Sequence, residues 1–237
     1  MTTTPEPTSA VPGRLILIRH GQSNANVARK LDTRPPGQSL TDDGRDQAVA
    51  FGRTHSRRPP AALLASIAVR AQQTADLIGG VIARPVETVE GIHEVQAGDL
   101  EDRNDADAHR LFAGTYAQWF TGRPDRAIPG GESGTDVLTR YLPEVDLIRE
   151  RLADGDVWVV SHGAAIRWVA ATLAGVDGRF ATTRHLDNTE TAELVLGPDG
   201  RWTCVRWGRE IPPFPIPSAD APSIDSDISD ISSNPMG

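Results

Sequence analysis

The sequence predicts an α/β fold in which helices flank a mainly parallel central sheet, giving three layers. Short apolar runs of strand length alternate with longer segments of helical periodicity along the 237 residues, and this alternation is typical of parallel sheets. Two of the apolar runs end in the same way, with a histidine followed by a glycine. We find no internal repeat and no second domain in the pattern.

The first half of the chain opens with a strand over 15–18, a short apolar run bounded by glycines. Residues 41–54 predict a helix, because Thr41 is a suitable N-cap and two aspartates fall in the first turn. The next expected elements are a strand, a helix and a strand, over 61–65, 68–82 and 86–89.

The second half continues with an amphipathic helix over 104–121 and a longer helix that opens near Ser133. Ser133 and Asp136 have the spacing of a capping box, and Pro143 predicts either a kink or a later start. The remaining expected elements are a strand that ends at Ser161, a helix over 164–174 stopped by Gly175, and two strands over 189–196 and 202–207.

The two ends of the chain differ in amino-acid composition from residues 14–210. Residues 1–13 and 211–237 are rich in Pro, Ser, Thr and Asp and contain no Lys or Arg. Such segments bury too little apolar surface to offset the entropy of ordering. We therefore interpret them as a disordered N-terminal tail and a C-terminal tail around one domain at 14–210, with Phe214 and Ile216 as candidates for packing on its surface.

The charge pattern argues against a nucleic acid partner and against an anionic membrane. The net charge is −8, but residues 14–210 hold 27 acidic and all 24 basic residues, a net of −3. No run approaches the roughly 18 apolar residues of a membrane helix, and the N-terminus lacks the regions of a signal peptide. We expect a cytoplasmic protein, and the sequence leaves its oligomeric state open, a homodimer included.

Polar residues at two strand ends predict a site for a small anion. Residues 19–21 (Arg-His-Gly) and 161–163 (Ser-His-Gly) each follow a strand, and ligands of α/β sheets bind at the carboxyl ends of strands. If the two strands are neighbours, both imidazoles face one crevice. The glycines allow close approach to the backbone, and the helix after the second histidine offers N–H groups.

Arg70 adds a third component, because it falls in the first turn of the helix after strand 61–65. Arginine suits the bidentate recognition of phosphate oxygens. Taken singly, His20 is more often a structural residue and Arg70 a surface ion-pair partner, so the combination carries the prediction. Metal binding is the weaker interpretation, since Cys204 is the single cysteine and no third ligand has a suitable spacing. We expect neither a metal nor a cofactor.

Five segments, in order, resemble the motifs of the histidine phosphatase superfamily, in its phosphoglycerate-mutase-like branch. They are RHGQS at 19–23, SIAVRAQQTA at 66–75, HEVQAGDLED at 93–102, GGES at 130–133 and VVSHG at 159–163. The resemblance covers about residues 14–208 and implies a phosphoglycerate-mutase-like fold and phosphoryl transfer through a phosphohistidine.

The resemblance also implies roles for individual residues. His20 is the expected nucleophile, and Glu94 is the expected proton donor, with Asp99 and Glu101 as nearby competitors. The expected ligands of the phosphoryl oxygens are Arg19, Arg70 and His162. The expected substrate-binding positions are Ser23, Asn26 and Gly163.

Departures from the family pattern favour a phosphatase over a mutase. Gln22 stands where many relatives have Glu, residues 32–41 lack the Gly-Trp pair expected of mutases, and Ala164 replaces their Asn. We expect a metal-independent phosphomonoesterase acting on a small phosphorylated metabolite, which the sequence does not identify. The alternatives are a mutase or other phosphotransferase and, less favoured, a non-catalytic binder of a phosphorylated ligand. Four arginines are candidates for contacting a second anionic group: Arg103, Arg110, Arg123 and Arg126.

Overall fold

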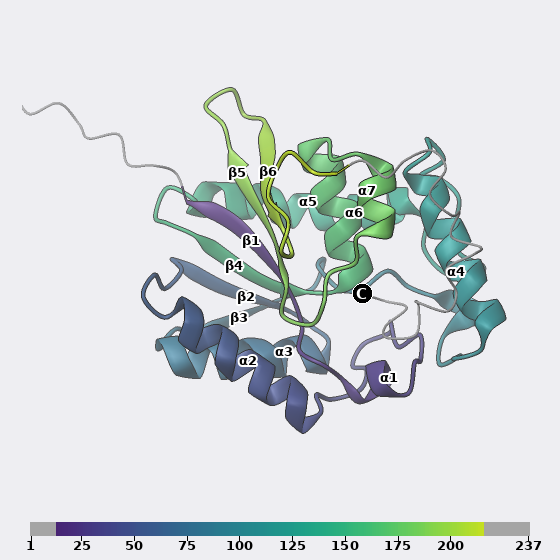
Figure 1. Ribbon diagram of the computed structural model, residues 1–237, viewed down its shortest axis with the longest axis horizontal. Helices are drawn as coiled ribbons and strands as arrows, with labels where there is room; N and C mark the ends of the chain where they lie inside the picture. The colour runs from purple at the N-terminus through teal and green to yellow at the C-terminus, as the bar shows by residue number, and fades with distance from the viewer. Residues whose placement is uncertain (1–12, 216–237) are drawn as a thin grey trace, which may run out of the picture.

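The computed structural model describes residues 13–215, and it confirms the three-layer α/β fold (Figure 1). Within these residues a six-stranded sheet has the order β3-β2-β4-β1-β5-β6. The strands are β1 (Arg14–Arg19), β2 (Ala62–Ser66), β3 (Val86–Val89), β4 (Val157–Ser161), β5 (Thr191–Leu196) and β6 (Trp202–Trp207). The first four strands pair in parallel, and β5 and β6 are antiparallel to their neighbours.

Helices cover both faces of the sheet. Figure 1 shows α2 and α3 on one face, and α5, α6 and α7 toward the other, with α4 beyond them. The helices are α1 (Asn24–Val27), α2 (Asp42–His55), α3 (Val69–Ile82), α4 (Ala106–Trp119), α5 (Gly134–Arg151), α6 (Gly163–Ala174) and α7 (Gly178–Thr183), and a short 3-10 turn, η1, spans Gly98–Leu100.

Alternation along β1 explains the two cores. Ile16 and Ile18 belong to the cluster with Ala48 of α2 and Ala75 of α3, whereas Leu15 and Leu17 belong to the larger cluster on the other face. Successive side chains of a strand point to opposite faces. A strand that is apolar at every position is therefore buried on both sides, as the uninterrupted run predicts.

The expected long elements are confirmed with small shifts at their ends. Thr41 caps α2, Gly175 ends α6 in the left-handed conformation, and Ser133 and Asp136 form the predicted capping box of α5. α5 runs through Pro143 as one helix. The short elements α1, η1 and α7 were not predicted, because three to six residues are too few to show a helical period.

The predicted tails lie almost wholly outside the described residues. At the C-terminal end Phe214 stacks on Phe180, with ring centroids 4.8 Å apart, which confirms that Phe214 packs on the domain. Ile216 lies outside the described residues. Among residues 13–215, no helix has the length and apolar character that a membrane crossing requires.

A close backbone approach holds the segment after β1 against α2. A Cβ on Gly21 would lie 2.4 Å from the Gly44 carbonyl oxygen, and a Cβ on Gly44 would lie 2.0 Å from the Gln22 carbonyl oxygen. Backbone atoms cannot move away as a flexible side chain does. Both glycines are therefore required for the chain to leave β1 in this direction.

Replacing Gly44 with alanine should destabilise the protein by about 1–3 kcal/mol, because the new methyl group meets backbone. The matched control is Gly80→Ala in α3, where a Cβ would meet nothing within 4 Å. There alanine should stabilise the helix by about 0.5–1 kcal/mol. Midpoints of urea unfolding measure both changes, and a Gly44→Ala variant as stable as Gly80→Ala would contradict the close approach.

Candidate active site

The two histidines at the strand ends lie side by side. β1 and β4 are neighbours, and their register pairs Arg19 with Ser161, so the residues that follow emerge at the same edge. The rings of His20 and His162 are 5.2 Å apart between centroids, and both side chains are buried. β1 and β4 are therefore neighbours, as the prediction required, and the two imidazoles lie together at one edge of the sheet.

His20 is held as a neutral ring with a defined tautomer. Its Nδ1 lies 2.7 Å from the Gly21 carbonyl oxygen, and since a carbonyl only accepts, Nδ1 carries the proton. Nε2 then has a free lone pair, which accepts from Arg70 Nε at 3.0 Å. Burial, and next the positive charges of Arg70 and Arg19, lower the pKa of His20 well below its usual value.

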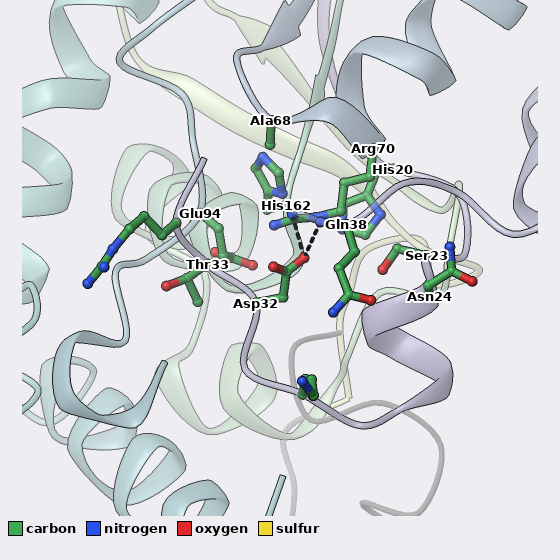
Figure 2. A network of polar contacts seen from close by, with 12 residues as sticks. His20, Ser23, Asn24, Asp32, Thr33, Gln38, Ala68, Arg70, Glu94 and His162 are labelled. Carbon is green, nitrogen blue, oxygen red and sulfur yellow. Dashed lines mark hydrogen bonds and ion pairs between the residues drawn. The ribbon is translucent and has the colours of Figure 1, made fainter. Parts of the chain in front are cut away.

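Arg70 reaches the site from the first turn of α3, as predicted. Its buried guanidinium spans His20 and Asp32, with Nη1 3.1 Å from Asp32 Oδ2. Figure 2 shows this pair in the middle of the polar network. The start of α3 is also tied to the preceding loop, since Val69 N donates to the Pro36 carbonyl oxygen at 2.8 Å.

Arg19 and His162 present buried polar atoms that lack partners. Arg19 Nη1 donates to the Leu186 carbonyl oxygen at 2.6 Å, but within the described residues Nε and Nη2 have no partner. His162 Nε2 lies 2.8 Å from Ser66 Oγ, and its Nδ1 likewise finds no partner in residues 13–215. Unpaired buried donors on a cation are costly, so these atoms fit an anionic ligand.

The Arg19 guanidinium keeps its charge at neutral pH. Burial lowers its pKa to about 10, and the nearby Glu94 carboxylate opposes the shift. The pKa of His162 is also lowered well below its usual value, by burial first and then by Arg70 and His20. The site therefore combines charged guanidinium groups with two neutral imidazoles.

Glu94 lies at the same edge of the sheet, but its surroundings differ from the expectation. Its Oε1 accepts from Val95 N and Ala165 N at 2.8 and 2.9 Å, and its Oε2 accepts from Ala164 N at 3.2 Å. The N–H groups at the start of α6, expected to be open to a ligand, are thus occupied by a carboxylate. A buried carboxylate needs such donors. Oε2, with one longer bond, is the less engaged oxygen.

Arg140 of α5 places the segment that carries Glu94. It donates to the carbonyl oxygens of Gly91, His93 and Glu94 and pairs with both oxygens of Glu132. Glu132 belongs to the GGES segment, in which the sequence had indicated only helix capping. No spacing rule connects Arg140 with Glu94 along the chain, so these hydrogen bonds were not predictable from the sequence.

The two competitors for the role of Glu94 are placed elsewhere. Glu101 accepts from the backbone N–H groups of Thr33 and Arg34 at 2.8 and 3.0 Å and from the Thr33 hydroxyl. It therefore anchors the loop 32–41. Asp99 is exposed and lies beside Gly130.

The three candidate substrate-binding residues lie close to the histidines but have local partners. Ser23 and Asn26 form the capping box of α1, and Asn26 Oδ1 also lies 3.3 Å from Asn188 Nδ2. Asn188 donates to the His20 carbonyl oxygen at 3.0 Å as well, a contact that no motif predicted. Gly163 is the first residue of α6.

Gln22, which departs from the family pattern, turns toward α2. Its Oε1 accepts from the hydroxyl of Thr41 at 2.9 Å, and Thr41 is the N-cap of that helix. The Gln22 carbonyl oxygen accepts from Thr41 N at 2.9 Å. The Gln22 side chain therefore stabilises the contact between the segment that follows β1 and the start of α2.

At the carboxyl edge of this α/β sheet, a neutral histidine lies beside two buried arginines, and one of them, Arg19, has unpaired donors. Such an arrangement is suited to binding a phosphoryl group. Residues 15–210 match the family model of the histidine phosphatase superfamily, branch 1, and the chain belongs to this superfamily.

Relatives within the superfamily include phosphatases and mutases. A glucosyl-3-phosphoglycerate phosphatase of Mycolicibacterium vanbaalenii is 32% identical over 217 residues, covering 84% of this chain and 93% of the relative. A 2,3-bisphosphoglycerate-dependent phosphoglycerate mutase of Chelativorans sp. is 33% identical over 196 residues, covering 79% and 94%. The structure of a mycobacterial glucosyl-3-phosphoglycerate phosphatase matches with a TM-score of 0.71 and 25% identity, covering 84% and 99%. The chain spans 38% of the length of one longer relative.

Stability should fall as the pH drops below about 6.5. His20, His162 and His185 have folded-state pKa values well below the usual one, chiefly through burial. Below about 6.5 the unfolded chain therefore binds more protons than the folded one. Each histidine then contributes a loss approaching about 1.4 kcal/mol per pH unit.

Urea unfolding of the wild type and of a His162→Asn variant between pH 7 and pH 5 measures this dependence. The variant should lose less stability per pH unit than the wild type, by about the contribution of one histidine. Equal slopes would show that the pKa of His162 is the same in the folded and unfolded protein and contradict the lowered pKa.

Proposed function

We propose that this protein is a metal-independent phosphatase that hydrolyses phosphomonoesters through a phosphohistidine intermediate on His20. The observation that carries the proposal is the unprotonated His20 Nε2, which accepts from Arg70 Nε and lies near the unpaired buried donors of Arg19. Phosphoryl transfer needs an in-line nucleophile and neutralisation of the equatorial oxygens. Two guanidinium groups supply that neutralisation without a metal ion.

In the first step, the phosphoryl oxygens accept from Arg19 Nε and Nη2, from Arg70 and from His162 Nδ1. His20 Nε2 attacks phosphorus, the N–P bond forms, and the bond to the ester oxygen breaks. The departing alkoxide takes a proton from Glu94, which acts in this step as the carboxylic acid. The Gly21 carbonyl oxygen, which accepts from His20 Nδ1, stabilises the positive charge that develops on the ring.

In the second step, a water molecule attacks the phosphohistidine. The Glu94 carboxylate, now deprotonated, takes a proton from the water, and His20 leaves with the electron pair of the N–P bond. Inorganic phosphate is the product, and the site returns to its starting protonation state. The hydrogen bond from Arg140 to the Glu94 carbonyl oxygen keeps the Glu94 side chain close to the reacting oxygen in both steps.

Small phosphorylated metabolites are the proposed substrates, in line with the glucosyl-3-phosphoglycerate phosphatase among the relatives. The net charge of −3 in residues 14–210, the proposed catalytic domain, disfavours nucleic acids and anionic membranes as partners. We also propose that the protein is located in the cytoplasm.

The second candidate function is a phosphoglycerate mutase, which the mutase of Chelativorans sp. supports. A mutase must bind the second anionic group of a bisphosphate. Two of the four arginines considered for that purpose, Arg103 and Arg110, pair instead with Asp105 and Asp107 of their own segment, which favours the phosphatase. Phosphate release and isomer formation, measured on the same phosphoglycerate, separate the two activities.

Replacing His20 with alanine should lower the hydrolysis of 4-nitrophenyl phosphate by about a thousandfold or more, because the nucleophile is lost. His109→Ala is the control, since that ring contacts the Arg29 carbonyl oxygen. EDTA should leave wild-type activity unchanged. Activity that survives in His20→Ala, or is lost in EDTA, would refute the mechanism.

The Glu94→Gln variant should lose about a hundredfold or more in kcat on alkyl phosphates and far less on 4-nitrophenyl phosphate. Alkoxides need a proton to leave, whereas nitrophenolate leaves without one. Asp99→Asn, exposed and in the same segment, is the control. Equal losses on both substrates would assign the proton donor to another residue.

A further inference from the structure

Asp32 is a second buried carboxylate at the site, and neither the family motifs nor the mechanism above uses it. Its Oδ2 accepts from Arg70 Nη1 at 3.1 Å and from Gln38 N at 2.9 Å, and its side chain is 9% exposed. Figure 2 shows Asp32 pointing to the space between Glu94 and Arg70, below His162. Arg70 thus has an anionic partner within the protein itself.

The carboxylate changes the charge that an incoming phosphoryl group meets. Arg19 and Arg70 carry two positive charges, and the Asp32 carboxylate pairs with one of them. Since both imidazoles are neutral, Asp32 offsets about one of the two positive charges that the phosphoryl group meets. A dianionic phosphoryl group therefore gains less from Arg70 than it would gain from an unpaired guanidinium.

Bond formation at His20 frees only one of the two contacts of Arg70. When Nε2 joins phosphorus, its lone pair no longer accepts from Arg70 Nε, and an oxygen of the attached phosphoryl group takes its place. The contact of Nη1 with Asp32 remains. A phosphoryl oxygen that approaches Nη1 must share that donor with Asp32 Oδ2.

The loop that carries Asp32 is anchored, so the carboxylate stays beside Arg70. Thr33 is bound through its backbone and hydroxyl to Glu101, and its Oγ1 accepts from Ala97 N at 2.9 Å. Gly37, with φ +66°, passes directly over the ion pair. A Cβ there would lie 2.5 Å from Arg70 Nη1 and 3.0 Å from Asp32 Oδ2.

We propose that Asp32 competes with phosphoryl oxygens for Arg70 and thereby weakens the binding of inorganic phosphate, so that the product leaves quickly. This inference rests on the proposed function, because it concerns the phosphate that the reaction releases. A carboxylate with a purely positioning role would instead strengthen phosphate binding by holding Arg70 in place.

Titration calorimetry of inorganic phosphate into the wild type, Asp32→Asn and Asp32→Ser tests the proposal. Asn removes the charge but keeps an oxygen that can accept from Gln38 N and Arg70. Ser removes the charge and also shortens the side chain. Both variants should bind phosphate about tenfold or more tightly than the wild type, and phosphate should inhibit them at correspondingly lower concentrations. Their melting temperatures should rise more on addition of phosphate.

The matched control is Asp102→Asn. Asp102 lies in the neighbouring segment, is 71% exposed at its side chain and pairs with Lys30. Its φ of +63° suits Asn as well as Asp. This variant loses the same formal charge, but its phosphate affinity should stay within about twofold of the wild type because exposed charges are screened.

If phosphate binding is unchanged or weaker in both Asp32 variants, Asp32 does not compete with phosphate for Arg70. The proposed function would remain intact. An absence of phosphate binding in the wild type and in both Asp32 variants would overturn both proposals. Tighter binding in Asp102→Asn, equal to that in Asp32→Asn, would also overturn the inference, because a general charge effect would then explain the result.

Discussion

The parallel pairing of β1 with β4 is the constraint on which the candidate site depends. Its register sets Arg19 opposite Ser161, and the next residue of each strand is the histidine that faces the site. β2 pairs with β4 on the other side, which brings Ser66 to His162 and the first turn of α3 to His20. Three segments that are distant in sequence therefore meet at one edge of a rigid, doubly covered sheet.

Buried charge then decides what this edge can do. Arg19 and Arg70 are removed from water, so they require anionic or carbonyl partners. Asp32, Glu94 and the Leu186 carbonyl oxygen meet part of that requirement. The unpaired donors of Arg19 lie at the proposed phosphoryl site. The same burial keeps His20 neutral, so one arrangement suits both the proposed nucleophile and the proposed anion site.

The loops that carry the carboxylates are held by other side chains rather than by the sheet. Arg140 and Glu132 fix the backbone around Glu94, and Glu101 fixes the loop of Asp32 through Thr33. These bonds join residues 8–68 positions apart. They depend on how α5 and the two loops pack together, and no local sequence pattern contains that information.

The sequence by itself determined the order and type of the long elements, the N-caps Thr41 and Ser133, and the segments that supply His20, Arg70, Glu94 and His162. Local rules suffice for the elements and caps, because apolar periodicity and capping act between neighbouring residues, whereas Glu94 came from the resemblance to the family. Only the tertiary structure decided that Glu94 occupies the N-terminus of α6, that Gln22 serves the cap of α2, and that Asp32 pairs with Arg70. Those contacts follow from packing between distant segments, where burial selects the partner of each polar group.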